Sequence, residues 1–286
     1  MARAPADNRG MTPLSSADSP RPSTFSATSS ATSSATPTAA PDPQHRFDDA
    51  ERAAVYRAIA LRRDMRHFTP SAPLPDEQLE RLLQAAHAAP SVGLMQPWRF
   101  MRLSTTAWRE RLMPIVEAER RGTAQALGER GAEFLGVNVE GLRDCAELLA
   151  IVLAPDDGTV FGRLSLPREM AWCSAACAVQ NLWLAARAEH LGLGWVSMFD
   201  PAALRQALAL PEGAEPLGLL CLGPVPDFYE QPMLEATGWR QARPLREMLM
   251  EPPAPSGGGP ARLRRRPPSV LPSVCQRGQA PRRKPL

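Results

Sequence analysis

Residues 168–191 form the least charged long stretch of the chain, and they restrict the fold more than any other segment. Their few charged side chains are Arg168, Glu169, Arg187 and Glu189. The uncharged part, 170–186, is shorter than the ~20 residues that a membrane-spanning helix needs, and it contains Gln180 and Asn181. We expect a long helix that ends at Gly192 and is covered on all sides. Either one domain or a second copy of the chain can cover it, and we favour a homodimer.

The two ends of the chain differ in composition from the middle. Residues 1–45 consist largely of Ser, Thr, Ala, Pro and Asp, with little apolar surface to offset the entropy of ordering. Residues 251–286 are rich in Pro, Gly and Arg and carry eight basic residues against Glu251, a net charge of +7. Because the whole chain carries +3, the remainder carries −4. We therefore expect disorder in both ends, a single domain at 46–250, and no nucleic-acid binding by that domain.

The five cysteines show no C-x-x-C pair and no spacing with histidine that is typical of a zinc site. We therefore expect no metal. Cys173 and Cys177 share one face of the long helix and are expected to be small buried side chains. An odd, scattered set of cysteines favours a reducing compartment, and the N-terminus lacks a secretory signal. These features predict a cytoplasmic protein that is not bound to a membrane.

The apolar patterns of residues 46–250 predict an α+β fold, with a central mixed sheet surrounded by helices. Further helices are expected at 48–61, 76–89 and 202–210. Strands are expected at 98–103, 147–154, 194–199 and 217–223, the second as a central strand because it is almost continuously apolar. No G-x-G-x-x-G after a strand and no P-loop occurs, so a dinucleotide fold or a kinase has no support.

The sequence RRDMRHF at 62–68 is the first candidate for chemistry. In an extended segment Arg62, Asp64 and Arg66 would face one side. Arginine side chains at this spacing suit phosphate or a delocalised anionic ring. The alternative is a ladder of surface salt bridges, which this segment alone would favour.

Three further segments are candidates for ligand contacts. In APSVGLMQPW at 89–98, an irregular turn leaves backbone N–H groups and Gln96 free to meet a polar ligand. In LGLGWVSMF at 191–199, the glycines permit close approach of a flat ligand. In GWRQARPLREML at 238–249, Arg240 precedes an expected last helix and is positioned to reach a phosphate. Each segment is equally compatible with an ordinary connection.

The four segments together resemble the FMN-dependent nitroreductase family. The resemblance covers most of residues 50–250 and is carried by ERAAVYRAI with RRDMR, LLQAAHAAPSVGLMQPWRF, CAVQNLWLAARAEHLGLGWVS, and LCLG with GWRQ. It implies a nitroreductase-like α+β fold and a homodimer that holds FMN at the subunit interface. Such an interface would cover the long helix.

Within this family, position 64 indicates a subgroup. Most members carry Arg-x-Ser-x-Arg in this place, whereas Asp64 is similar to the flavin-cleaving subgroup. That resemblance implies Asp64 and Ser197 as catalytic residues. It further implies a set of flavin contacts: Arg62, Arg63, Asp64, Met65, Arg66, Pro90, Ser91, Gln96, Gly194, Ser197 and Arg240.

The subgroup consumes reduced FMN as a substrate, with dioxygen as co-substrate. The expected products are 5,6-dimethylbenzimidazole, the lower ligand of cobalamin, and erythrose 4-phosphate. A separate NAD(P)H–flavin reductase would supply the reduced FMN. Two alternatives stay open: a conventional NAD(P)H-dependent FMN nitroreductase or flavin oxidoreductase, and a non-catalytic flavin-binding protein that uses the basic tail as a contact.

The chain also departs from the subgroup. An acid and a tyrosine that commonly precede CAVQNLW are replaced by Ala171 and Cys173. Residues 104–146, which cover the flavin as a lid in the family, resemble it only at 139–143. A lid matters because it keeps water from the reacting flavin.

Overall fold

A computed structural model describes residues 46–136, 141–159 and 167–252. The chain divides into two compact units, residues 1–54 and residues 55–286. Helix α1 (Asp49–Leu61) includes residues of both units and begins with a reciprocal cap between Asp48 and Glu51. Each residue's backbone N–H donates to the other's carboxylate at 2.8 Å, which satisfies two N–H groups that a helix start leaves free. The expected disorder at 1–45 and 253–286 lies outside the described residues.

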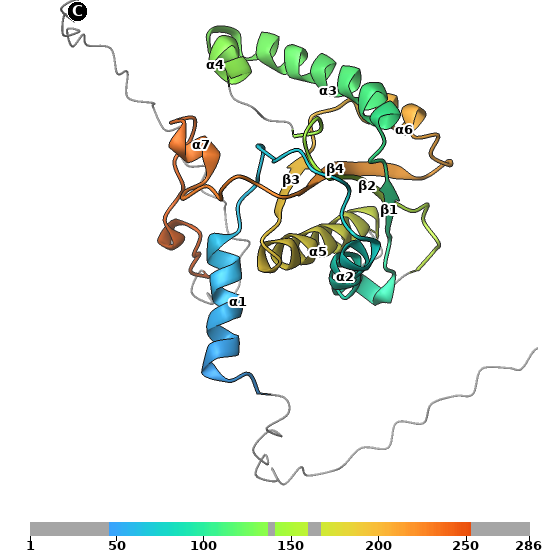
Figure 1. Cartoon of the computed structure of the whole chain (residues 1–286). Helices are drawn as coiled ribbons and strands as arrows, with labels where there is room; N and C mark the ends of the chain where they lie inside the picture. Colours follow the sequence, from blue (N-terminus) through green and yellow to red (C-terminus); the bar gives the residue numbers. More distant parts are fainter. Residues whose placement is uncertain (1–45, 137–140, 160–166, 253–286) are drawn as a thin grey trace, which may run out of the picture. The chain divides into compact units, whose positions relative to one another are not determined.

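The second unit is built on a four-stranded sheet in the order β1-β2-β4-β3 (Figure 1). Its strands are β1 (Trp98–Arg102), β2 (Glu147–Leu153), β3 (Gly192–Val196) and β4 (Glu215–Gly223). Each neighbouring pair is antiparallel. The expected mixed character is limited, in the described ranges, to an isolated parallel bridge between Asp64 and Leu193. As predicted, β2 is central, and all of its residues are buried.

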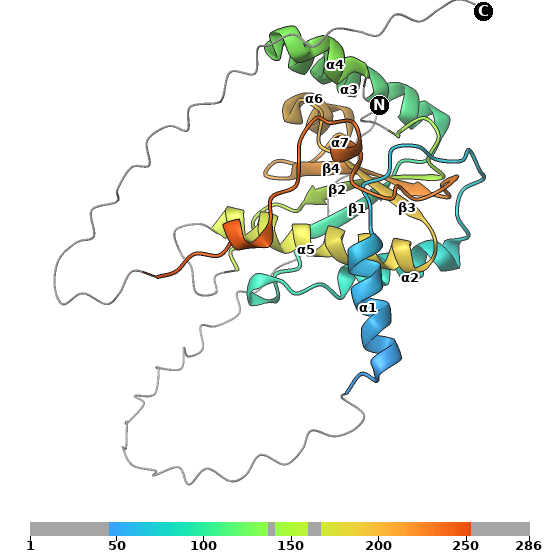
Figure 2. The same cartoon turned by 90° about the vertical axis from the view of Figure 1, so that its left-hand side faces the viewer.

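The period of two along the strands separates the core into two layers. Leu149 and Ile151 of β2 belong to a cluster with helices α2 (Asp76–His87) and α5 (Pro167–Ala188). Leu148 and Ala150 face the opposite cluster, which includes residues of α3 (Thr106–Ala126) and α6 (Pro201–Ala207). Helices α2 and α5 therefore cover one face of the sheet, and α3 and α6 cover the other (Figures 1 and 2). The prediction of an α+β fold is confirmed.

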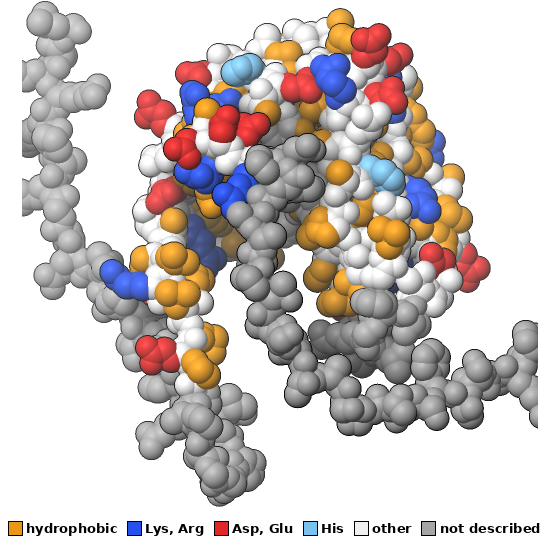
Figure 3. All heavy atoms as spheres, turned by 90° about the horizontal axis from the view of Figure 1, so that it is seen from below, with side chains coloured by type: hydrophobic (Ala, Val, Ile, Leu, Met, Phe, Trp, Pro, Cys, Tyr) orange, Lys and Arg blue, Asp and Glu red, His pale blue; other side chains and the backbone are white. Residues whose placement is uncertain are grey.

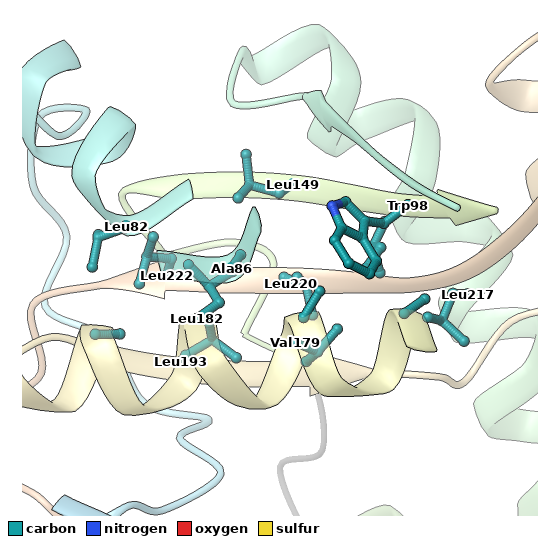
Figure 4. Packing of buried hydrophobic residues seen from close by; sticks show 14 of the residues in the cluster. Leu82, Ala86, Trp98, Leu149, Val179, Leu182, Leu193, Leu217, Leu220 and Leu222 are labelled. Atoms are coloured by element: carbon teal, nitrogen blue, oxygen red, sulfur yellow. The ribbon is translucent and has the colours of Figure 1, made fainter. Parts of the chain in front are cut away.

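The first layer shows why the apolar helix is needed. Val179 and Leu182 of α5 pack against Leu220 and Leu222 of β4, and Trp98 closes the layer from β1 (Figure 4). Burying one such aliphatic side chain contributes about 1.5–3 kcal/mol relative to leaving it exposed. This packing fixes α5 under the strands that carry the candidate site.

In the single chain, α5 is not covered on all sides. One face is buried, but Cys173 and Cys177 on the other face are exposed. The expectation that these two cysteines are buried small side chains is therefore wrong for the single chain. Hydrophobic side chains reach the surface on this side of the molecule, where α5 and α2 lie (Figure 3). Among the described helices, none is long and apolar enough to cross a membrane.

Two regions differ from the sequence-based assignment. Between β1 and β2 lie helices that the apolar pattern did not indicate: α3, the 3-10 turn η3 (Gly128–Arg130) and α4 (Gly131–Gly136). After β4, the chain forms α7 (Met233–Ala236) and a 3-10 turn, η4 (Leu245–Glu247). The last helix expected within 238–249 is thus reduced to one turn, which Pro244 immediately precedes.

Candidate functional site

The segment that carries Asp64 lies along the free edge of β3. The backbone N–H of Met65 donates to the Leu193 carbonyl at 3.0 Å, and Met65 is fully buried. Gly194 makes this approach possible, because a Cβ atom there would lie 2.2 Å from the Met65 carbonyl oxygen. The glycine therefore serves the packing of the chain on itself.

The side chains of Asp64 and Arg66 bind the two backbone polar groups of one residue, Trp195. Oδ1 of Asp64 accepts the Trp195 N–H at 3.0 Å, and Nη2 of Arg66 donates to the Trp195 carbonyl at 2.9 Å. The same Nη2 also pairs with Oδ2 of Asp64. These contacts replace the backbone hydrogen bonds that an edge strand otherwise lacks. The expected orientation of positions 64 and 66 toward one side agrees with this geometry.

The surroundings of Asp64 are intermediate between the two alternatives that the sequence left open, an arginine site for an anion and a ladder of surface salt bridges. The Arg66 side chain is only 10% exposed and that of Asp64 is 41% exposed, so the pair is not a ladder at the open surface. Burial raises the pKa of Asp64 above its ordinary value. The charges of Arg66 and Arg62, and the hydrogen bonds from Trp195 and Arg66, oppose that rise.

The other two arginines of the segment take different directions. The Arg62 guanidinium lies over the Trp183 ring of α5, 4.8 Å from its centroid. Arg63 turns away and donates to the carbonyls of Ala60 at 2.8 Å and Glu230 at 2.7 Å. Arg62 and Arg66 therefore stay near Asp64, whereas Arg63 ties the segment to the chain after β4.

A second group of predicted residues surrounds the 3-10 turn η2 (Val92–Leu94). Oγ of Ser91 accepts the Gln96 N–H at 3.1 Å, and Oγ of Ser174 on α5 accepts the Val92 N–H at 3.2 Å. Gln96 itself has a positive φ of 40°, which is uncommon for a residue with a side chain. The loop is thus held in an unusual conformation and fixed to α5.

The two groups are attached to different parts of α5. Ser174 anchors the Ser91 loop, and Trp183 underlies Arg62. Nine residues of helix separate these anchors by roughly 13 Å along the axis. Contacts among the described residues thus unite Arg62, Asp64, Met65, Arg66 and Gly194, but they join neither Pro90, Ser91 nor Gln96 to that group.

The remaining predicted residues lie in exposed positions. Ser197 follows β3 and is exposed, two residues beyond Trp195, or roughly 7 Å along an extended chain. Arg240 is exposed and follows Trp239, whose ring is covered by Arg130 at 3.7 Å. In the described part of the chain, no group of three or more His, Cys, Asp or Glu residues is arranged to hold a metal ion.

Three aromatic residues at this site were not identified from the sequence. Trp195 supplies the backbone N–H and carbonyl that Asp64 and Arg66 bind, and the Trp183 ring lies under Arg62. The hydroxyl of Tyr229 contacts the backbone of Arg66 and His67. Trp195 and Trp183 lie in segments that the sequence had marked, but Tyr229 lies in a connection without any motif.

The model of the Nitroreductase family matches residues 59–224. The chain belongs to the nitroreductase family. Within this family, it is 37% identical over 204 residues to the 5,6-dimethylbenzimidazole synthase of Rhodospirillum rubrum, covering 69% of this chain and 94% of that protein. It is 35% identical over 202 residues to the enzyme of the same name from Rhodobacter capsulatus, covering 69% and 96%.

A solved structure confirms the nitroreductase-like fold. The BluB-like flavoprotein of Clostridium difficile aligns with a TM-score of 0.54 at 17% identity, covering 70% of this chain and 99% of that one. The predictions of family and fold made from the four segments are therefore confirmed.

Proposed function

We propose that this protein fragments reduced FMN with dioxygen to give 5,6-dimethylbenzimidazole and erythrose 4-phosphate. The nitroreductase relatives that match it along nearly their whole length carry the name of that synthase. The observation that carries the proposal is a carboxylate, Asp64, fixed between the Trp195 N–H and Arg66 at the edge of β3. A neutral serine in that place would supply neither a negative charge nor a group that readily gains and loses a proton.

The residues around Asp64 fit a flavin. Nη1 of Arg66 is buried and has no hydrogen-bond partner within the described ranges, so a donor is available for a polar ring atom or a phosphate. Arg62 lies on the same side and adds a second positive charge. Arg62, Asp64, Met65, Arg66 and Gly194 would hold the flavin from one side, and bound FMN would supply the electrons and the ring that becomes the product.

Asp64 has the properties of a group that moves a proton. Its pKa is raised by burial, so it is closer to the working pH than an ordinary aspartate. The Trp195 N–H and Arg66 fix the direction of the carboxylate, which reduces the entropy lost on reaching the reactive geometry. Ser197, further along the same chain, would accept or donate one hydrogen bond to the substrate.

The second subunit of a homodimer would supply the missing half of the site. The loop that contains Pro90, Ser91 and Gln96 is attached to α5 through the bond between Val92 and Ser174, and Cys173 and Cys177 lie on an exposed face of α5. A dimer formed through that face would cover α5 and bring one subunit's Ser91 loop toward the other subunit's Asp64. Arg240 would then contact the phosphate of FMN, as the sequence predicts.

The proposed reaction needs a source of reduced FMN. We place that step in a separate NAD(P)H–flavin reductase, and the whole process in the cytoplasm. The test is to incubate the full chain with FMN, a flavin reductase, NADPH and air, and to look for 5,6-dimethylbenzimidazole by chromatography. Absence of that product, together with rapid bleaching of FMN by NADPH and this protein alone, would establish a conventional nitroreductase instead.

The Asp64→Asn variant tests the role of the carboxylate within that assay. It is expected to bind FMN but to form little or no benzimidazole. The matched control is Asp157→Asn, which changes an exposed aspartate in the chain that follows β2. Normal product yield from Asp64→Asn would remove Asp64 from the proposed reaction.

A further inference from the structure

Three consecutive residues, Phe228, Tyr229 and Glu230, hold the segment that carries Asp64 in place. Each makes its contacts at a different position along that segment. Arg187 of α5 lies over the Phe228 ring, 3.8 Å from its centroid, and donates to the Leu61 carbonyl at 3.3 Å. The Glu230 carbonyl accepts a hydrogen bond from Nη2 of Arg63 at 2.7 Å. Tyr229, between them, acts closest to Asp64.

The hydroxyl of Tyr229 has three hydrogen-bond partners. It accepts the backbone N–H of Arg66 at 3.1 Å and that of His67 at 3.2 Å. Nδ1 of His67 lies 2.7 Å away and can receive the hydroxyl proton. A tyrosine hydroxyl offers two lone pairs and one proton, so these three contacts use all of its capacity. The His67 ring also stands edge-on to the Tyr229 ring, with 6.0 Å between centroids.

Two successive N–H groups that converge on one oxygen fix the backbone at that point. The contact with Arg66 holds the backbone from which one of the paired side chains, that of Arg66, leaves. It therefore sets the direction in which Arg66 leaves the chain, toward the Trp195 carbonyl and Asp64. Without the hydroxyl, both N–H groups would lose their partner, and Arg66 would be free to reorient.

We propose that Tyr229 is a positioning residue for the Asp64–Arg66 pair, an inference that rests on the function proposed above for that pair. Tyr229 touches neither the pair's carboxylate nor its guanidinium. Its hydroxyl binds the backbone of Arg66 and His67. In this way it keeps the Asp64 carboxylate and the Arg66 guanidinium in position to bind the Trp195 backbone.

The test is the Tyr229→Phe variant, which removes one oxygen and keeps the ring. A small misplacement of a reacting group can reduce a rate by about 100-fold. We expect the rate of benzimidazole formation to fall about 10- to 100-fold, with the Kd for FMN and the Tm nearly unchanged. The matched control is Tyr56→Phe, since the chain has two tyrosines and Tyr56 is 67% exposed.

The outcomes separate the possible readings. An unchanged rate in Tyr229→Phe would overturn the proposal, and so would a fall in rate that follows a matching loss of FMN affinity or of Tm. If the wild type and Tyr56→Phe form no benzimidazole, the proposed function fails. Amide exchange then decides the positioning role on its own: Arg66 and His67 should exchange faster in Tyr229→Phe than in the wild type, and equal exchange would refute it.

Discussion

The ionisation of Asp64 has a consequence for stability that can be measured without any substrate. An unfolded aspartate has a pKa of about 3.9, and burial raises the pKa of Asp64 in the folded chain. Between these two values the folded state binds more protons than the unfolded state. The free energy of unfolding therefore falls as pH rises through that interval, and the loss remains at higher pH.

The Asp64→Asn variant cannot ionise, so it should lack this loss. We expect its free energy of unfolding, relative to wild type, to increase as pH rises from about 4 to 7. Denaturant titrations at several pH values measure the difference. Asp157→Asn is a control of opposite sign, because bonds to Thr159 lower the pKa of Asp157. Parallel pH profiles of Asp64→Asn and wild type would contradict the raised pKa.

Gly194 gives a second prediction for a single residue. A Cβ atom there would meet the Met65 carbonyl oxygen at 2.2 Å, so the edge segment would have to move away from β3. We expect Gly194→Ala to cost about 1–3 kcal/mol of stability, as overpacking typically does, and to lower benzimidazole formation. Gly122→Ala in α3 is the control, since nothing lies within 4 Å of its Cβ position. Equal stability of the two variants would mean that the close approach is not required.

At the scale of elements, a buried ionic cluster joins β1, β2 and the chain before α2. Glu147 is fully buried and accepts hydrogen bonds from Arg102 at 2.5 and 2.9 Å, from Ser104 at 2.5 Å, and from the Leu74 N–H at 3.1 Å. Removing one partner of a fully buried pair typically costs about 3–5 kcal/mol, but the Arg102 side chain is 41% exposed and also pairs with Asp76, so the cost here should be about 1–3 kcal/mol. We expect Glu147→Leu to lose about that much, measured by denaturant unfolding. A loss below about 1 kcal/mol would show that Arg102 finds water instead.

The helices between β1 and β2 are joined to the segment that carries Arg240. Trp239 lies under Arg130, and its centroid is 6.0 Å from that of Phe134 in α4. Cation–π and aromatic contacts of this kind contribute about 0.5–1.5 kcal/mol each. In Trp239→Ala we expect faster amide exchange in α4, by about 5- to 30-fold, whereas Trp239→Phe should retain much of the protection. Unchanged exchange in α4 would show that the two elements are independent.

The sequence predicted some elements well because their signals are local. The almost unbroken apolar run of β2 follows directly from the burial of all its residues on both faces of the sheet. The helices at 106–136 were not predicted, because their apolar residues are sparse and many charges lie between them. The Asp64–Trp195 contact could not be predicted from the sequence pattern either, since it joins positions 131 residues apart. Only the family resemblance indicated that the two segments act together.

At the scale of the whole molecule, the residues that the sequence predicts for the site form two separate groups within the single chain. The Ser91 loop and the Asp64 segment are attached to α5 at Ser174 and Trp183, too far apart for one set of short contacts. The uncovered face of α5, with Cys173 and Cys177, lies on the same helix as both anchors. A second copy that covers this face would therefore act on stability and on the site at once.

The Cys177→Glu variant tests that arrangement, because it adds a charge to the uncovered face. A buried unpaired carboxylate in an interface is strongly unfavourable. We expect a dimer for the wild type and a shift to monomer for the variant in sedimentation velocity, with weaker FMN binding by fluorescence titration. Ala118→Glu, at an exposed position of α3, is the control and should remain dimeric. If Cys177→Glu were monomeric but bound FMN as tightly as the control, the second subunit would not contribute to the flavin site. If Cys177→Glu remained dimeric, this face of α5 would lie outside the interface.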